Sequence, residues 1–439
     1  NFALSGNHLP VYFLFSNIDI MKRVTWSLIL LLMFSGCAEE KPVQEDTRPT
    51  TAFQDPPDWA KEAIWYQIFV ERFHNGDPNN APTIIDIKNC YPFVIPSNWW
   101  MNSTKETYGL SWIFPGTILV WIWALQDIRE NGAESDYVDW YWVDTFDDPA
   151  TAEDEFTYQG WFDLPSLPEI KETDRHQNHA VVQAYEGNLA SETAKEHIFA
   201  VTRRWLDPNN DGDPSDGVDG FRLDVAGELP LGFWREFRQC VRQVNPDAYL
   251  LGEIWWKEWP DDLLDPAPFL EGDVFDAVMN YRWYRAARHY FNESPTPIAV
   301  SEFVDSLNSF RSNLRQQSNY ALMNLTASHD VPRVGTSLFN KNKYKVHVKP
   351  NEDSSYKIHK PDQATYDILH LLLIQQFTYV GAPHIWAGDE MGMWGADDPS
   401  CRKPLIWPEL QFEAEVFHPL GQERPQDQVV VPSESRSVQ

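Results

Sequence analysis

The stretch "GFRLDVAGELP", Gly220 to Pro230, decides the fold assignment. It begins with a glycine, alternates apolar with charged residues and ends at a proline. Arg222 and Asp224 are two positions apart, and in a β-strand such residues point to the same face. A surface hairpin could carry both charges without consequence, whereas a barrel strand would direct both of them into one site. The surrounding sequence distinguishes these two interpretations.

Strand-like apolar segments alternate with helix-like segments along most of the chain. The helix-like segment after Ser191 has an apolar face at Ile198, Val201 and Trp205, which predicts an amphipathic helix. This alternation predicts an α/β fold with a parallel sheet and helices outside it, and in a (β/α)8 barrel the carboxyl ends of the strands carry the active site. The strand-like segments are AIWYQIFVERF (63–73), GVDGFRLDVA (217–226), DAYLLGEIWW (247–256), DVFDAVMNYR (273–282), YALMNLTASHD (320–330) and GAPHIWAGDE (381–390).

The composition is that of a globular protein with an acidic surface. Of the 439 residues 43% are hydrophobic and 23% are charged, with a formal net charge of -30. A surface this negative repels phosphate, which argues against nucleic acid as a partner and favours a neutral ligand. The 20 tryptophans and 25 phenylalanines fit either core packing or the stacking of aromatic rings on sugars. The sequence does not specify the oligomeric state.

Residues 21–37 are similar to the signal of a bacterial lipoprotein. Met21 is followed by Lys22 and Arg23, by an apolar run too short to span a membrane, and by "SGC". "MFSGC" resembles a lipobox, in which the Cys37 thiol receives the lipid and becomes the N-terminus after cleavage. We therefore expect an extracytoplasmic protein held to the membrane through a lipid anchor, at the periplasmic or the cell surface. A buried N-terminal helix is the alternative.

Three acidic residues come at the ends of three different strand-like segments. Asp224 follows "GFRL", Glu253 follows "YLLG" and Asp330 follows "TASH". Hydrolysis of a glycosidic bond needs two carboxyl groups with unequal pKa values, one ionised and one that carries a proton. Arg222, on the same strand face as Asp224, favours the charged form of that carboxyl. This pattern predicts Asp224 as the nucleophile.

Glu253 has different surroundings. It is followed by Ile254, Trp255 and Trp256, and such apolar neighbours raise the pKa of a carboxyl group by desolvation. We therefore predict Glu253 as the general acid/base. Each acidic residue alone is equally well explained as a structural ion pair or a strand-end cap, but three in this order favour the catalytic interpretation.

These stretches resemble the signature regions of the α-amylase family, glycoside hydrolase family 13. "GFRLDVAGE", "GEIWW" and "SHDVPR" are similar to its short motifs, and "IWYQIFVERFHNGDPNN" to its first barrel strand and loop. "SLPEI" resembles the end of its inserted B domain, and "APHIWAGDEMGMWGADDPSCRKPLIW" its eighth strand and beyond. The sequences of these motifs are most similar to those of the neopullulanase, cyclomaltodextrinase and maltogenic amylase branch. The resemblance covers about 56–80 and 124–425.

The resemblance implies a (β/α)8 TIM barrel with a small inserted B domain. It also implies a retaining hydrolase of α-glucosidic bonds in starch-type glucans such as maltooligosaccharides, pullulan or cyclodextrins, with no cofactor needed for the chemistry. Asp224, Glu253 and Asp330 would be nucleophile, acid/base and transition-state stabiliser. The residues expected to bind substrate are Arg222, His329, Glu228, Trp255 and Arg333.

One signature of the family is missing. A second strand, a third strand and an Asp-x-x-x-Asn-His motif at the end of the third are expected, and no such motif occurs in residues 81–125, between the first strand and the next recognisable segment. The segment after Ala81 is too short for two strand–helix units, and "GTILVWIWAL" (116–125) is predicted to supply one strand. We place six strands and expect an incomplete barrel. Either a segment has been deleted, which the clean resumption of the pattern favours, or the chain is a reduced variant that binds glucan without cleaving it.

Two acidic segments are similar to calcium loops. In "DPNNDGDPSDG" (207–217) Asp207, Asn209 and Asp211 take alternate positions, but Val218 stands where an EF-hand has glutamate. Asn75 and Asp77 in "NGDPNN" resemble a calcium loop of the same branch. A bound Ca²⁺ would be structural, and a solvated acidic turn is the alternative.

Three functions stay open at this point. They are an anchored α-glucan hydrolase, favoured by the carboxylates; an inactive glucan-binding lipoprotein, favoured by the missing Asn–His region; and a transglycosylase of the same family. The predicted segments are 1–20, sequence upstream of the natural start; 21–37, lipoprotein signal; 38–56, tether; 57–425, catalytic barrel with a B-domain-like insertion at about 126–178; and 426–439, a polar tail that leaves no C-terminal β-domain.

Overall fold

The computed structural model describes residues 53–69, 115–161, 167–173, 184–258, 262–343, 353–397, 400–403 and 405. The chain divides into two compact units, 4–53 and the remainder, and almost all described residues belong to the remainder. Cys37, Asn75 and Asp77 lie outside the described residues. Within the described ranges, no helix combines the length and the apolar character that crossing a bilayer requires.

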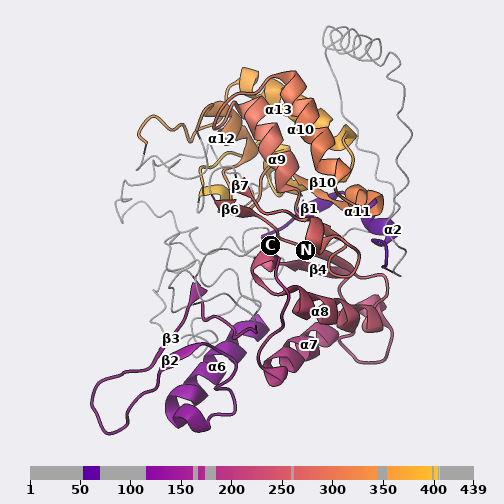
Figure 1. Cartoon of the computed structure of the whole chain (residues 1–439). Helices are drawn as coiled ribbons and strands as arrows, with labels where there is room; N and C mark the ends of the chain where they lie inside the picture. Colours follow the sequence, from indigo (N-terminus) through magenta and orange to yellow (C-terminus); the bar gives the residue numbers. More distant parts are fainter. Residues whose placement is uncertain are drawn as a thin grey trace, which may run out of the picture. The chain divides into compact units, whose positions relative to one another are not determined.

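Six short parallel strands form the centre of the described fold (Figure 1). They are β1 (Trp65–Gln67), β4 (Gly220–Leu223), β5 (Tyr249–Gly252), β8 (Ala277–Val278), β9 (Met323–Leu325) and β10 (Ala382–Trp386). One sheet has the order β4-β5-β8 and the other the order β1-β10-β9. A parallel bridge between Met279 and Met323 connects β8 to β9. The strands therefore follow one another in the order β4-β5-β8-β9-β10-β1.

This order is that of a parallel barrel, because the last strand, β10, pairs with the first, β1. Each of the six strand-like segments recognised in the sequence contains one of these strands. In the part of the chain that the structure describes, the outer edges of β1 and β4 have no strand partner. Residues 70–114 lie outside the described ranges, so the absence of two barrel strands stays a prediction.

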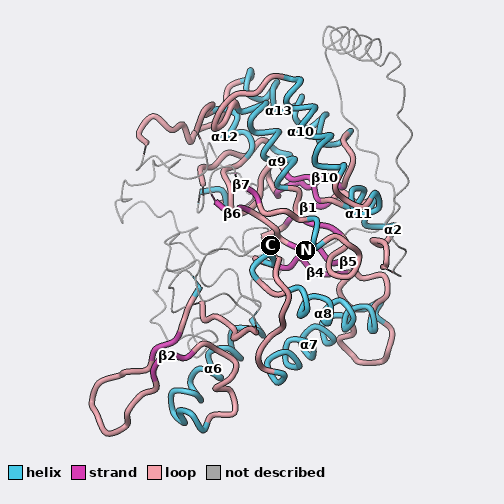
Figure 2. The backbone as a smooth tube through the Cα atoms, viewed as in Figure 1, coloured by secondary structure: helices cyan, strands magenta, loops and turns pink. Residues whose placement is uncertain are grey.

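Helices connect the strands and pack against them (Figure 2). α8 links β4 to its parallel neighbour β5, and α7 lies beside α8. The α-helices are α2 (Asp58–Lys61), α6 (Pro115–Asn131), α7 (Glu192–Leu206), α8 (Leu231–Val244), α9 (Tyr281–Ala287), α10 (Val300–Ser312), α11 (Gln316–Ala321), α12 (Val334–Phe339) and α13 (Gln363–Thr378). A π-helix, η7 (Arg288–Asn292), extends α9, and the 3-10 helices are η2 (Gly132–Glu134), η4 (Pro214–Asp216), η5 (Ala226–Glu228), η6 (Ala267–Phe269), η8 (Asp389–Met391) and η9 (Ser400–Arg402).

α7 begins as the sequence predicts, with Ser191 as its N-cap, but it buries a different face. The Ser191 hydroxyl accepts a hydrogen bond from a backbone N–H in the first turn, as a capping serine does. The helix buries Phe199, Thr202 and Leu206, whereas Trp205 is 45% exposed. The expectation that Trp205 belongs to the buried face was wrong, because the true apolar stripe is set one residue later.

α6 overturns a second expectation. The segment 116–125, predicted to supply a strand, forms the first half of this helix. The apolar run continues without a glycine or proline into "QDIREN", and a short apolar run cannot be assigned to strand or helix by periodicity alone. The good helix formers that follow therefore decide its conformation.

α6, the region after it and the start of α7 share a hydrophobic cluster separate from the main core. A short antiparallel pair, β2 (Val143–Thr145) and β3 (Thr157–Tyr158), lies within the predicted insertion of about 126–178. A second antiparallel pair, β6 (Trp256–Glu258) and β7 (Asp262–Leu263), follows β5. The cluster beside β2 and β3 contains the buried residues Ala124, Ile128, Trp140, Tyr141, Phe156 and Ala194.

The main core lies between the parallel strands and their helices. Leu250 and Leu251 of β5 are almost fully buried in it, and each such burial stabilises the fold by about 1.5–3 kcal/mol. Gly252 ends β5 where a Cβ atom would stand 2.4 Å from the ring of Phe275. A larger residue would therefore displace that ring or the strand end, and with it the position of Glu253.

Candidate active site

The acidic residues singled out in the sequence meet at one edge of the parallel strands. Asp224 directly follows β4, Glu253 directly follows β5, and Asp330 comes shortly after β9. Parallel neighbours end at the same edge of a sheet, so these side chains start from adjacent positions. β1 ends at this edge with Gln67.

One arginine joins the first two carboxylates. Arg222 Nη1 contacts Asp224 Oδ1, and Arg222 Nη2 lies 2.6 Å from Glu253 Oε1. Burial on its own would lower the pKa of Arg222, but Glu253 and Asp224 more than offset it, so that its pKa is raised. The guanidinium therefore stays charged between the two acids. The Asp224 side chain is 51% exposed and that of Glu253 only 3%, so solvent or a ligand reaches Asp224 far more easily.

Glu253 is held on both oxygens. Oε1 accepts a hydrogen bond from the Tyr281 hydroxyl at 2.8 Å, and Oε2 accepts one from the Val225 backbone N–H at 3.0 Å. Burial raises the pKa of Glu253 to about 7; Arg222 opposes this shift and Asp224 adds to it. A carboxyl group with this pKa carries a proton for part of the time near neutral pH, which is what a general acid requires. The desolvation expected from the sequence is thus present.

Val225 supplies that N–H from a strained backbone. Its φ is 47° and its ψ 32°, which lies in the left-handed region that β-branched residues avoid. The residue stands between Asp224 and η5, where the chain turns away from the strand. The turn directs the Val225 amide at Glu253, and strained conformations of this kind concentrate at functional sites.

The third acidic residue forms a second group with a histidine and an arginine. Asp330 Oδ2 lies 3.2 Å from His329 Nε2, and Asp330 Oδ1 accepts a hydrogen bond from Arg402 Nη2 at 3.1 Å. Arg402 Nε also donates to the His329 carbonyl at 2.7 Å. Burial, helped by Arg222 and Arg402, holds the pKa of His329 well below its usual value. His329 is therefore neutral at physiological pH.

Trp161, which was not predicted as a site residue from the sequence, contacts both Glu228 and Trp255. Trp161 Nε1 donates a hydrogen bond to Glu228 Oε2 at 2.7 Å. The rings of Trp161 and Trp255 stack with centroids 6.1 Å apart and planes 18° apart. The only sequence signal for Trp161 was its place in an aromatic-rich and acidic segment.

Arg333 is placed differently from the other predicted residues. Its side chain is 1% exposed, and Nη1 donates to Asp389 Oδ1 and to the Ala387 carbonyl, both at 2.9 Å. Burial raises the pKa of Asp389 to about 6, and Arg333 opposes this shift. The Arg333 guanidinium therefore forms a buried ion pair with Asp389, in the segment that follows β10. This placement does not support the sequence-based assignment of Arg333 to substrate binding.

The described acidic loop at 207–217 is closed by hydrogen bonds to its own backbone. Asp207 Oδ1 and Asn209 Oδ1 both accept from the Asp211 N–H, at 3.1 and 2.9 Å. Asp207 Oδ2 accepts from the Gly212 N–H at 2.9 Å. In the described ranges no group of three or more His, Cys, Asp and Glu side chains is arranged to hold a metal ion. Calcium binding at this loop stays a prediction.

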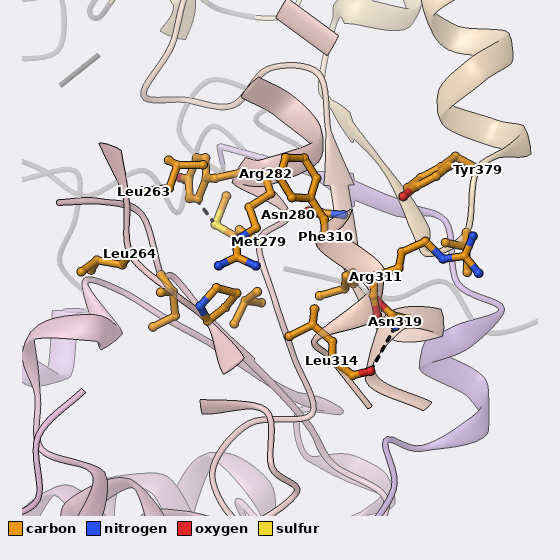
Figure 3. A pocket seen from close by; sticks show the side chains of 16 residues that line it. Leu263, Leu264, Met279, Asn280, Arg282, Phe310, Arg311, Leu314, Asn319 and Tyr379 are labelled. Atoms are coloured by element: carbon orange, nitrogen blue, oxygen red, sulfur yellow. Dashed lines mark hydrogen bonds between the residues drawn. The ribbon is translucent and has the colours of Figure 1, made fainter. Parts of the chain in front are cut away.

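A pocket lined mainly by apolar residues lies between the segments around β7, α9 and α10 (Figure 3). Ile254, the neighbour of Glu253, and Tyr281, its hydrogen-bond donor, both line it. Among its described lining residues there is no carboxylate, so the pocket does not form part of the acid cluster. Other lining residues are Leu263, Leu264, Met279, Phe310, Leu314 and Tyr379.

Comparison with known proteins shows which sequences this chain resembles. Residues 122–427 match the family model for the alpha amylase catalytic domain. A cyclomaltodextrinase from Geobacillus thermopakistaniensis is 31% identical over 414 residues, which cover 81% of this chain and 60% of that protein. Neopullulanase 2 from Thermoactinomyces vulgaris is 29% identical over 421 residues, covering 82% of this chain and 62% of that protein. The chain thus spans about 60% of the length of these relatives.

Solved structures support the fold. A cyclic α-maltosyl-(1→6)-maltose hydrolase from Arthrobacter globiformis, in complex with its named sugar, superposes with a TM-score of 0.54 at 24% identity. That match covers 81% of this chain and 80% of the other. A cyclomaltodextrinase structure gives a TM-score of 0.53 at 26% identity, covering 83% of this chain and 62% of the other.

Proposed function

Because the chain belongs to the α-amylase family of glycoside hydrolases, we propose that it cleaves α-glucosidic bonds of starch-type glucans with retention of configuration. One observation carries this proposal, the unequal setting of two carboxyl groups that share Arg222. Asp224 is half exposed beside the guanidinium, and Glu253 is buried with its pKa raised to about 7. Retaining hydrolysis needs one ionised and one protonated carboxyl group.

The residues divide the reaction as follows. Glu253 gives its proton to the glycosidic oxygen while Asp224 attacks the anomeric carbon, so the bond to the leaving sugar breaks as the bond to Asp224 forms. Glu253, now a carboxylate, then takes a proton from water. That water replaces Asp224 at the anomeric carbon, which restores both groups. Asp330 and neutral His329 hold hydroxyl groups of the sugar in this scheme.

The relatives guide the choice of substrate. Their names, cyclomaltodextrinase and neopullulanase, point to cyclodextrins and pullulan as substrates of this chain, beside the maltooligosaccharides expected from the sequence. Glu228, Trp161 and Trp255 form an aromatic and acidic surface beside the acid/base, and sugar rings stack on such surfaces. This surface would contact the leaving sugar.

The decisive experiment compares the intact chain with Glu253→Gln on maltoheptaose, pullulan and β-cyclodextrin. The variant keeps the shape of the side chain but cannot donate a proton as an acid, so reducing-sugar release should fall by at least ~100-fold. Equal release by the two proteins would refute the assignment. Product analysis at high substrate concentration separates hydrolysis from transfer, since both share the glycosyl intermediate and differ in the acceptor.

A second function is favoured by one observation, the lack of an Asp-x-x-x-Asn-His motif in residues 81–125, the stretch expected to supply the third strand. Under this alternative the protein binds glucan without cleaving it. Calorimetry with maltoheptaose that shows binding in the absence of product would favour the alternative.

Two further proposals concern the chain outside the acid cluster. Lipid attachment at Cys37 would place the protein outside the cytoplasm, and labelling cells with radioactive palmitate should mark the intact chain but not Cys37→Ser.

Structural Ca²⁺ at Asp207, Asn209 and Asp211 predicts a higher melting temperature with CaCl₂ than with EDTA. An unchanged melting temperature would leave the loop as a solvated acidic turn.

A further inference from the structure

Gln67, the last residue of β1, bridges two buried histidines that come from different parts of the chain. Its Nε2 lies 2.7 Å from His329 Nδ1, and its Oε1 lies 3.1 Å from His384 Nε2. His329 is 5% exposed and His384 in β10 is 3% exposed. Asp330 Oδ2 lies at the other end of the first ring, 3.2 Å from His329 Nε2. The four side chains form a continuous row, Asp330–His329–Gln67–His384.

The chemistry of each group fixes the direction of every hydrogen bond in this row. A carboxylate only accepts, so His329 Nε2 must carry the proton that faces Asp330. In a neutral ring the other nitrogen, Nδ1, is then an acceptor, and only the NH₂ end of the Gln67 amide can donate to it. The carbonyl end of Gln67 consequently faces His384 and accepts from Nε2–H. His384 Nδ1 is left as a bare lone pair.

One observation agrees with this direction, and the neutral state of His384 is consistent with it. His384 Nδ1 is buried without a hydrogen-bond partner, and a buried lone pair is tolerated better than a buried N–H. Burial also holds the pKa of His384 down, to about 4, so its ring is neutral. Reversing the Gln67 amide would instead turn His329 Nε2 into a lone pair against the Asp330 carboxylate.

We propose that Gln67 is a positioning residue that holds His329 in the Nε2–H tautomer, with His384 holding the Gln67 amide in turn. His329 then presents a neutral N–H donor, Nε2–H, at the active-site edge. When a sugar binds, this N–H can donate to a sugar hydroxyl in place of Asp330. This role rests on the proposed function in one respect only, namely that the group accepting the hydrogen bond from His329 is a sugar hydroxyl. The tautomer itself follows from the four side chains.

The surroundings of His329 keep this arrangement neutral. The charged groups that act on the ring are Arg222, Arg402, Asp224 and Asp330, and the two arginines oppose its protonation. Phe69 and Trp386 pack on the ring with centroids 5.8 and 6.2 Å away. The ring plane is therefore fixed by packing, and Gln67 has only to fix which nitrogen carries the proton.

Nitrogen NMR of the full chain labelled with ¹⁵N-histidine tests the proposal directly, with His329→Asn used to assign the signals. The expected spectrum shows His329 protonated on Nε2 alone. Gln67→Glu offers two acceptor oxygens, so the proton should move to Nδ1 or the ring should become charged. Gln67→Met removes the donor at similar length and should give a mixture of tautomers. A wild-type ring protonated on Nδ1, or a Gln67→Met spectrum identical to the wild type, overturns the proposal.

A matched control separates positioning from packing. Gln376 in α13 is fully buried, and its Nε2 donates to the main-chain carbonyls of Asn324 and His384 at 2.7 and 2.8 Å. Gln376→Met should lower the melting temperature and leave the His329 tautomer unchanged. On maltoheptaose, Gln67→Met should reduce kcat/KM about tenfold, the value of one lost hydrogen bond. If the wild type fails to cleave any glucan, the proposed function fails while the tautomer measurement still decides the role of Gln67.

Discussion

Replacing Tyr281 with phenylalanine removes the hydroxyl that donates to Glu253 Oε1 at 2.8 Å and leaves the buried ring in place. That hydrogen bond stabilises the ionised form of Glu253, and a hydrogen bond to a charged group contributes about 1.5–3 kcal/mol. One pKa unit corresponds to about 1.4 kcal/mol, so the pKa of Glu253 should rise by about one to two units from its value of about 7.

The assay is the pH profile of kcat/KM on maltoheptaose. A general acid must be protonated, so activity falls as the pH rises through the pKa of Glu253, and the alkaline limb of Tyr281→Phe should lie one to two units above that of the wild type. Tyr249→Phe is the matched control, since that hydroxyl is equally buried and donates at 2.7 Å to the Ala321 carbonyl, away from the acids. An alkaline limb that stays in place or moves down in Tyr281→Phe would refute the reasoning.

Three further outcomes follow from the site. The folded-state pKa of Glu253, about 7, lies above its ordinary value of 4.5, so the folded protein binds the extra proton and loses stability as the pH rises between these values. In urea unfolding, the free energy of unfolding of the wild type should fall by on the order of 3 kcal/mol from pH 5 to pH 8, and that of Glu253→Gln should not. Equal losses in the two proteins would contradict the prediction. The left-handed conformation of Val225 costs about 1–2 kcal/mol, so Val225→Gly should change the free energy of unfolding by less than about 1 kcal/mol. Val241→Gly, in the buried face of α8, should lower the free energy of unfolding by several kcal/mol. Similar losses in the two variants would show that Val225 is unstrained. Trp161→Phe keeps an aromatic ring but loses the donor to Glu228, so KM for maltoheptaose should rise about threefold to tenfold with kcat within twofold; a fall in kcat alone would argue against a leaving-sugar surface.

The sequence predicts the parts of the fold that depend on local pattern. Each of the six parallel strands lies within a segment recognised by its apolar run, and Asp224 and Glu253 follow their strands directly. The two-residue period of a strand was enough to place Arg222 beside Asp224, and the contact between them confirms that placement. The catalytic roles of these residues stay predictions.

Contacts between distant segments could not be read in the same way. Gln67 and His329 are 262 positions apart, and their hydrogen bond exists only because β1 follows β9 and β10 in the sheet. Tyr281 lies on the helix after β8, and no local signal directs its hydroxyl at Glu253. Arg333 shows the converse, because a residue three positions from Asp330 turns into the core to pair with Asp389.

The Arg222 bridge has a consequence for how the site responds to salt. Two arginines, Arg222 and Arg402, contact the carboxylates Asp224 and Asp330, and these four charges cancel. When Glu253 holds its proton and His329 is neutral, the cluster is electrically balanced although the whole chain carries a formal net charge of -30. An uncharged oligosaccharide that meets a balanced cluster releases no counterions. Its affinity should therefore stay nearly constant from low to physiological ionic strength.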